Sequence, residues 1–238
     1  MTQHIASAYD RDLEEIQALI MKMGGLVEAA ILDGAQSLET HDVALAEKVR
    51  AGDKVIDDLE EQINEAAARV IALRAPVSKD LRVLLVTMKL AGSLERVGDY
   101  AKNMAKRTAV LAEMRAVDGT ESSLRRMARE VRGMLNDTLD AYLRGDADLA
   151  ESVRQHDQDV DQMYNALFRE FLTFMMEDPR NITACMHLHF IAKNVERMGD
   201  LVTNMAEQVI YLETGVMPEE ARPKGDNTSV TLIDDEGV

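Results

Sequence analysis

The sequence predicts an all-α protein of two tandem, pseudo-symmetric three-helix bundles, six long helices in all. Apolar residues recur at three- and four-residue spacing over long stretches, which is typical of helices with one buried face. Aromatic residues make up only 4% of the chain, Trp is absent and there are only four prolines; this composition favours helices over sheet. The pattern of helices and turns also repeats after about 100 residues.

The first predicted unit comprises residues 1–116. Its helices are expected over residues 8–39, 43–74 and from Pro76 to about Met114. Gly24 and Gly25 weaken the first helix without breaking it. Asp42 is expected to cap the second helix, since a side-chain oxygen there can accept from the first turn. Pro76 is expected in the first turn of the third helix, where its missing N–H costs nothing.

The second unit, residues 117–215, follows the same plan. Its helices are expected over residues 121–143, 146–176 and from the turn at 177–180 to about Thr214. Gly145 is expected to end the fourth helix, and Asp146 begins the fifth as Asp42 begins the second. Residues 216–238 contain two prolines, several acids and little apolar periodicity, and are expected to form a flexible, disordered acidic tail.

Charge and cysteine content limit the classes of function. The net charge of -16 argues against binding nucleic acid or an anionic membrane surface and favours cations or basic partners. The single cysteine, Cys185, leaves no intramolecular disulfide and suits a reducing compartment. No apolar run is long enough for direct membrane insertion, and the first 15 residues do not resemble a signal peptide. A cytoplasmic protein is therefore expected.

Carboxylates form stripes on four of the predicted helices, two stripes in each unit. The first unit contributes Asp53 and Asp57 on its second helix and Glu95, Asp99 and Asn103 on its third; the second unit contributes Asp157 and Asp161, then Glu196, Asp200 and Asn204. Residues four apart share one helix face. If each helix pair folds about its turn, the two stripes of a unit reach the same level, roughly 30 Å from the turn. Asp53 then faces Asp99, and Asp157 faces Asp200.

Four carboxylates at one level repel one another and raise each other's pKa values unless a cation or basic side chains compensate. Arg96 and Arg197 adjoin the stripes and are candidate partners. Oxygen ligands suit magnesium, calcium, manganese or iron, so one metal site per unit is expected. The stripes lack histidine, which counts against zinc and against a ferritin-like redox or metal-storage site. A metal-free helical scaffold with solvated acids is the remaining alternative.

Two smaller patterns lie near these stripes. Gly98 and Gly199 each precede an aspartate and are expected to let helices approach closely. His187 and His189 are two residues apart and therefore face different sides of a helix. We expect them at core or surface positions rather than as a pair of metal ligands.

Several stretches resemble the PhoU family, the accessory proteins of phosphate-specific transport. They are residues 75–82, 94–103, 178–183, 189–200 and 203–207. The resemblance covers about residues 8 to 214. It implies two three-helix bundles with Asp/Glu-x-x-x-Asp motifs that bind metal clusters in some members. These motifs map onto Asp53 and Asp57, Glu95 and Asp99, Asp157 and Asp161, and Glu196 and Asp200. Leu201 stands where the family usually has histidine, so any role of that histidine is not carried over.

The resemblance implies regulation rather than catalysis. PhoU-like proteins restrain the phosphate-starvation response when phosphate is plentiful and help to limit phosphate uptake. They are thought to link the ATPase subunit of the phosphate ABC transporter to a sensor histidine kinase. By this resemblance, a homodimer that binds divalent or trivalent metal ions (magnesium, manganese or iron) is expected.

Overall fold

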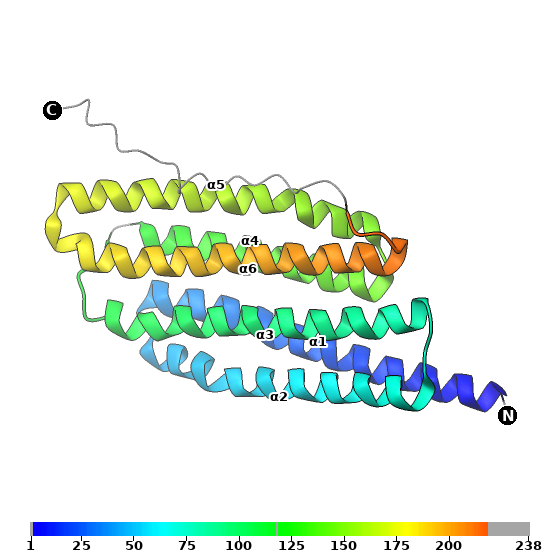
Figure 1. Cartoon of the computed structure of the whole chain (residues 1–238). Coiled ribbons are helices and arrows are strands. Elements are labelled where there is room, and N and C mark those ends of the chain that lie inside the picture. Colours follow the sequence, from blue (N-terminus) through cyan, green and yellow to red (C-terminus); the bar gives the residue numbers. More distant parts are fainter. Residues whose placement is uncertain (1, 118, 219–238) are drawn as a thin grey trace.

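Six α-helices lie side by side along one long axis in the computed structural model, which describes residues 2–117 and 119–218, with side chains from Tyr9 onward (Figure 1). The helices are α1 (Thr2–Thr40), α2 (Val43–Arg74), α3 (Lys79–Leu111), α4 (Thr120–Arg144), α5 (Ala147–Glu177) and α6 (Ile182–Thr214), with a 3-10 turn, η1 (Pro179–Asn181), before α6. The all-α class and the two groups of three helices are therefore confirmed.

The helix ends repeat between the two groups, as the sequence predicts. The Asp42 side chain accepts a hydrogen bond from the backbone N–H of Leu45 at 2.9 Å, and Asp146 accepts from Leu149 at 2.9 Å. Gly145 ends α4 in the left-handed region, with φ of 66°, a conformation that is unfavourable for residues with a side chain. Matching caps fix the start of both α2 and α5.

Two helix starts differ from the prediction. Helix α1 begins at Thr2 rather than at residue 8, and α3 begins at Lys79, so Pro76 lies before the helix and not in its first turn. Ala75 and Ser78 have φ values of 46° and 51°, so the backbone leaves the helical region on both sides of that proline. In the second group Pro179 does occupy a first-turn position, in η1.

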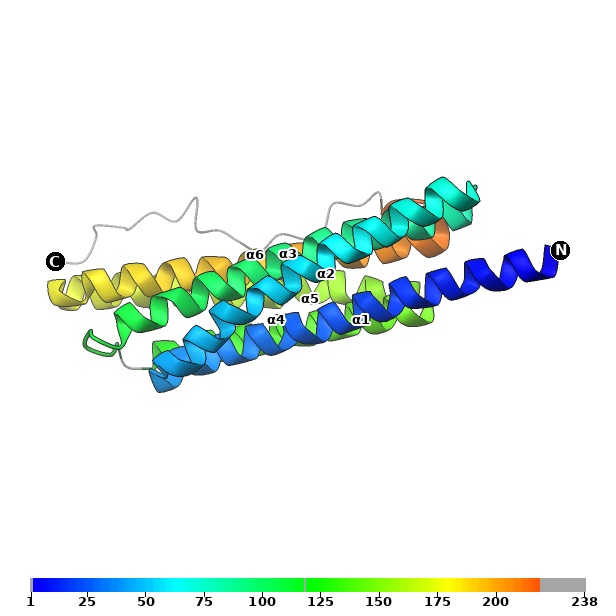
Figure 2. The same cartoon turned by 90° about the horizontal axis from the view of Figure 1, so that it is seen from below.

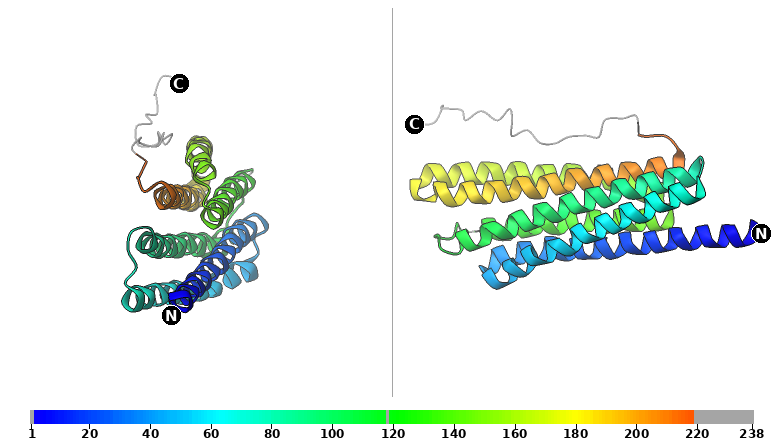
Figure 3. Two further views of the ribbon diagram at one scale, coloured as in Figure 1. Left: turned by 90° about the vertical axis from the view of Figure 1, so that its right-hand side faces the viewer. Right: turned by 60° about the horizontal axis from the view of Figure 1, so that its bottom comes forward.

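The two groups share one core. Helices α1, α3, α6 and α4 form a ring in which each contacts the next, while α2 packs on α1 and α3, and α5 on α4 and α6 (Figure 3). A single hydrophobic cluster contains residues from all six helices. The helices of the first group are thus stabilised by burial against the second as well as within their own bundle.

Helix α1 has 39 residues, and its first turns project beyond the other helices (Figure 2). It continues through Gly24 and Gly25 without interruption. A Cβ at Gly24 would collide with the end of the Leu139 side chain, whereas one at Gly25 would meet nothing within 4 Å. Gly24 therefore allows α1 and α4 to approach closely.

The last helix, α6, ends at Gly215, which has a φ of 80°. Residues 219–238 of the predicted acidic tail lie outside the described residues. Among the helices that the structure does describe, none has an apolar stretch of the length and composition needed to cross a bilayer.

Candidate functional site

The α2–α3 hairpin brings the carboxylates of the first group together. Lys102 on α3 donates to Asp53 Oδ2 on α2 at 2.5 Å and to Asp99 Oδ1 at 3.0 Å. The Asp53 residue is only 5% exposed. A lysine ammonium thus lies between the facing carboxylates and compensates a charge that burial would otherwise make costly.

The pKa values of Asp57 and Glu95, the other two acids of this cluster, are shifted by burial and by neighbouring charges. Burial, followed by the Asp53 carboxylate, raises the pKa of Asp57, while Lys102 acts in the opposite direction. Burial, followed by Asp99 and Asp57, raises the pKa of Glu95. Asp57 is exposed at the surface, so solvent and salt screen part of its interaction with the neighbouring carboxylates. All four carboxylates are within electrostatic reach of one another.

A glycine lies against the preceding helix at the carboxylate level in each group. A Cβ at Gly98 would lie 3.1 Å from Ile56 Cδ1 and 3.9 Å from Asp53 Oδ1. At the equivalent Gly199 it would lie 3.5 Å from Asp157 Oδ1. The close approach is therefore confirmed at Gly98, whereas a Cβ at Gly199 would meet its neighbours at ordinary van der Waals distances.

The second cluster is more deeply buried than the first. Asp157, Asp161 and Glu196 are 3%, 5% and 6% exposed, whereas Asp53 is the buried member of the first set. Lys193 donates to Glu196 Oε1 at 2.9 Å. Asp200 is partly buried beside them.

A buried arginine connects the two helices of the second cluster. Arg154 on α5 is 6% exposed; its Nη1 donates to Glu151 at 2.7 Å and its Nε to Glu207 on α6 at 3.3 Å. Sequence reasoning missed this residue, because nothing in the α5 pattern distinguishes it from a surface arginine.

The basic residues that pair with the carboxylate clusters differ from the two arginines that the sequence analysis named. Arg96 and Arg197 are exposed, and the ion pairs described above come from Lys102 and Lys193. Both lysines lie three residues from a stripe carboxylate on the same helix, a spacing that places two side chains on one face. This three-residue spacing is the sequence feature that could have identified the two lysines as ion-pair partners.

The two asparagines of the predicted stripes occupy different surroundings from the acids. Asn103 lines a groove between α3 and α6, and Asn204 is exposed. A role for either in supporting a metal ion stays a prediction.

The donor chemistry of both clusters fits a hard cation, because every predicted ligand is a carboxylate oxygen. Over residues 9–117 and 119–218, no group of three His, Cys, Asp or Glu side chains is arranged to hold a metal ion. In the first cluster the Lys102 ammonium already lies between Asp53 and Asp99. A metal ion there would have to replace that ammonium.

The two histidines contact different neighbours, as expected from their spacing of two residues. His187 Nδ1 lies 2.9 Å from Arg107 Nη1, and the ring of His189 packs 6.1 Å from Tyr164 and 5.6 Å from Phe168 between centroids. Burial lowers the pKa of both, followed in His187 by the Arg107 charge. Both are therefore held towards the neutral form.

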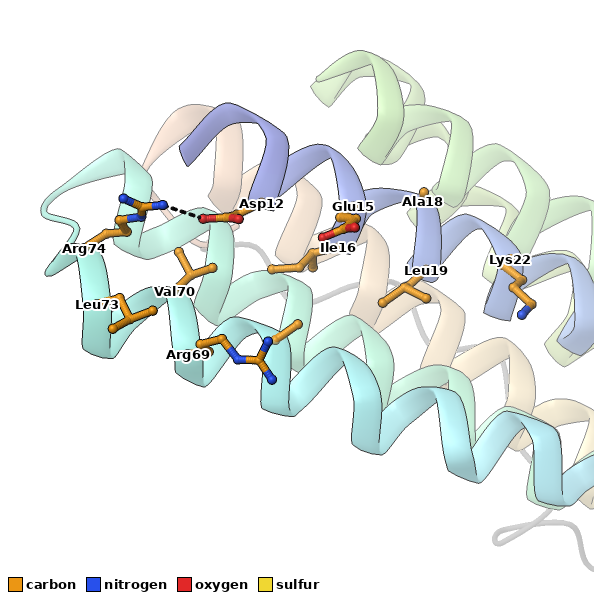
Figure 4. A pocket seen from close by; sticks show the side chains of 11 residues that line it. Asp12, Glu15, Ile16, Ala18, Leu19, Lys22, Arg69, Val70, Leu73 and Arg74 are labelled. Atoms are coloured by element: carbon orange, nitrogen blue, oxygen red, sulfur yellow. Dashed lines mark hydrogen bonds and ion pairs between the residues drawn. The ribbon is translucent and has the colours of Figure 1, made fainter. Parts of the chain in front are cut away.

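A separate groove lies between α1 and α2, with a volume of about 440 Å³ (Figure 4). Ile16, Leu19 and Val70 contribute apolar side chains to it, and an ion pair of 3.2 Å between Arg74 and Asp12 lies at one end. The groove is lined by none of the eight predicted carboxylates. This groove is therefore distinct from the two carboxylate clusters.

Comparison with known proteins gives one consistent result. The family model described as "PhoU domain" matches residues 20–108 and 124–209. These two segments correspond to the two groups of three helices.

Individual relatives match over almost their full length. A phosphate-specific transport system accessory protein PhoU homolog from Rhizobium meliloti is 44% identical, covering 95% of each chain. One from Caulobacter vibrioides is 43% identical, covering 95% of this chain and 98% of the relative.

Two solved structures have the same architecture. PhoU from Pseudomonas aeruginosa has a TM-score of 0.84 at 38% identity, covering 87% of this chain and all of that one. The phosphate transport system regulatory protein PhoU from Streptococcus pneumoniae has a TM-score of 0.82 at 30% identity, covering 89% of this chain and all of that one.

Proposed function

Because the chain belongs to the PhoU family, we propose that it is a regulatory accessory protein of a phosphate-specific transport system. The observation that carries the proposal is the match to both groups of helices, together with relatives of the same length that bear this description. The fold is compatible with a binding role, since long helices present extended surfaces to partners.

In the specific form of the proposal, the protein is a negative regulator of the phosphate-starvation response and a modulator of phosphate uptake. It acts as an adaptor that links the transporter's ATPase subunit to a sensor histidine kinase, as a homodimer in the cytoplasm. The net charge of -16 favours basic patches on these partners through electrostatic complementarity.

We include a metal-binding surface in the proposal. The ligands would be Asp53, Asp57, Glu95 and Asp99 in the first cluster and Asp157, Asp161, Glu196 and Asp200 in the second. A bound magnesium, manganese or iron ion would neutralise the clustered acids. The carboxylates come from both helices of each hairpin, so their neutralisation would favour close packing of α2 on α3 and of α5 on α6.

The regulatory role is tested by complementation. The gene is expressed in a bacterium that lacks its own PhoU protein and carries a reporter for the phosphate-starvation response. We expect repression of the reporter and reduced phosphate uptake when phosphate is plentiful. Unchanged reporter activity, with normal protein levels on an immunoblot, would refute the regulatory role.

The adaptor role is tested by pull-down from the same cells with tagged protein. Recovery of the ATPase subunit and the kinase under high phosphate is expected. Recovery of neither, with repression intact, would reject the adaptor role alone.

The metal part is tested separately by elemental analysis of gently purified protein. We expect metal in the wild type and a loss in the double variant Asp99→Ala/Asp200→Ala. Negligible metal in both would remove the metal surface from the proposal and leave the adaptor role standing. The ferritin-like alternative has no supporting observation, since no histidine lies in any of the four carboxylate stripes.

A further inference from the structure

A groove with a basic lining runs between α3 and α6. These helices are antiparallel: Lys89 donates to Gln208 at 3.1 Å and Arg82 to the backbone of Tyr211 at 3.1 Å. The groove has a volume of about 560 Å³ and is lined by Tyr100, Asn103, Lys106, Arg107, Val110, His187, Phe190, Asn194 and Arg197. Three of these residues are cations and none is an acid, in a chain with 43 acidic and 27 basic residues. The groove is thus a local reversal of the overall charge.

One of the cations is held in position by its neighbours. Arg107 Nη1 lies 2.9 Å from His187 Nδ1, and since arginine can only donate, the imidazole nitrogen accepts. The Arg107 guanidinium carbon also lies 4.6 Å from the centroid of the Phe190 ring, within the range of a cation–π contact. Both contacts come from α6 and orient a guanidinium that α3 carries. Holding the side chain in advance lowers the entropy lost when a ligand binds.

Further donors surround this guanidinium. Lys106 and Arg197 are exposed at the groove, and the amides of Asn103 and Asn194 also line it. Guanidinium, ammonium and amide N–H groups are the donors that bind phosphate oxygens, and the planar fork of arginine suits them best. The lining therefore offers several donors for an anion and no carboxylate to repel it.

The acidity of the whole chain does not prevent anion binding here. Exposed charges are largely screened beyond about 8 Å at physiological ionic strength. The charges nearest the groove therefore determine whether an anion is attracted to it. Asp99 lies one helical turn before Asn103 but is paired with Lys102 at 3.0 Å. On α6, Glu196 is paired with Lys193 at 2.9 Å. These ion pairs reduce the repulsion that the carboxylate clusters exert on a ligand in the groove.

We propose that the α3–α6 groove binds a phosphorylated small molecule with at least the charge of a diphosphate, through Arg107, Lys106 and Arg197. The phosphate oxygens accept from these cations, and the exposed Phe190 ring offers an apolar surface to a base or similar group. The proposal goes beyond the regulatory function above and does not depend on metal binding.

The experiment is titration calorimetry on the full-length, metal-free protein with pyrophosphate and with ADP, which share a diphosphate. Omission of divalent ions excludes bridging through the carboxylate clusters. The variants are Arg107→Gln and Arg197→Gln, with Arg129→Gln, an exposed arginine on α4, as the matched control. Thermal unfolding without ligand shows whether each variant is folded, and Arg197→Gln keeps the test decisive if Arg107→Gln is unstable.

We expect saturable binding of at least one of the two ligands, with affinity at least about tenfold weaker in Arg107→Gln and Arg197→Gln. The control should stay within about twofold, as for a remote surface charge. Binding of both ligands indicates recognition of the diphosphate, and binding of ADP alone indicates that the base contributes as well. Absence of saturable binding to either ligand, or equal weakening in the groove variants and the control, would overturn the proposal.

Discussion

Lys102 is the residue whose removal most directly tests how the first carboxylate cluster is stabilised. Its ammonium lies 2.5 Å from Asp53 and 3.0 Å from Asp99. Lys102→Met removes the charge and keeps an unbranched side chain that suits a helix. The exposed pair of Lys54 and Asp58, at 3.1 Å on the same helix hairpin, supplies the control Lys54→Met.

The expected cost follows from the burial of the partners. Breaking a buried ion pair by removing one member costs about 3–5 kcal/mol. Here the Asp53 side chain is 6% exposed, but those of Lys102 and Asp99 are 40% and 46% exposed, so solvent screens part of the interaction. We therefore expect about 1–2 kcal/mol of destabilisation, between the surface and buried limits. For a chain of this size that lowers Tm by about 2–8 °C.

The assay is thermal unfolding of metal-free protein, repeated with added manganese or magnesium. Without metal, Lys102→Met should unfold at a lower temperature, while Lys54→Met should be almost unchanged because exposed pairs contribute little. With metal, Lys102→Met should show the larger gain in Tm, since its ammonium no longer competes for Asp53 and Asp99 and a ligand of the native state stabilises it. Any binding at the second cluster would be common to all three proteins and would cancel in the comparison.

Two results would refute this reasoning. If Lys102→Met is as stable as Lys54→Met without metal, the ammonium does not compensate the buried charge. If metal raises the Tm of Lys102→Met no more than that of the wild type, the ammonium does not occupy the place of a cation.

Three further predictions concern stability and are checked by thermal unfolding. Gly25→Ala should stabilise the protein by about 0.5–1 kcal/mol, because alanine is the better helix former and nothing lies near its Cβ. Gly24→Ala should gain less or destabilise, because its Cβ meets Leu139; equal effects at both sites would contradict this. Folding raises the pKa of both Asp57 and Glu95, so their ionised forms destabilise the native state and stability should rise as pH falls from about 7 towards 4; Asp57→Asn should reduce that rise, leaving the part due to Glu95, and increase Tm near pH 7 without metal. Tyr142→Phe should cost about 1 kcal/mol by removing a buried hydrogen bond of 2.8 Å to α3, and an unchanged Tm would show that this bond makes no net contribution.

The sequence contains most of the information that positions the carboxylates within each unit. A helix rises by a constant amount per residue, so two residues at equal distances from a turn reach the same level once the helices pair. That geometry brings Asp53 beside Asp99, and the Asp42 and Asp146 caps set the start of the helices before each cluster. The prediction failed at Pro76, because Ala75 and Ser78 adopt positive φ values that the residue types do not specify.

Contacts between the two units could not be read from the sequence in the same way. Helical periodicity shows that a face is apolar but not which helix covers it. The ring of α1, α3, α6 and α4 arises from packing between residues far apart in the sequence. The groove that Arg107 and Phe190 share joins residues 83 positions apart. Within each unit, by contrast, the sequence does place Lys102 and Lys193 three residues from an acid on the same helix. We instead named Arg96 and Arg197 as candidate partners of the carboxylates.

The two clusters are built from the same motif but differ in how many of their carboxylates are buried. Three carboxylates are buried in the second cluster, and taking each ion out of water carries a penalty of several kcal/mol unless it is compensated. Buried Arg154 links α5 to Glu207 on α6, and Lys193 both pairs with Glu196 and lies 4.8 Å from the Tyr164 ring centroid.

In the first cluster a single partly exposed lysine compensates one buried acid, and Asp57 remains open to solvent. On the proposed metal binding, a cation from solution would reach the first cluster by displacing one side chain, whereas entry to the second would require several buried contacts to rearrange. Of the two, the first cluster is thus the one whose occupancy should respond faster to a change in cation concentration.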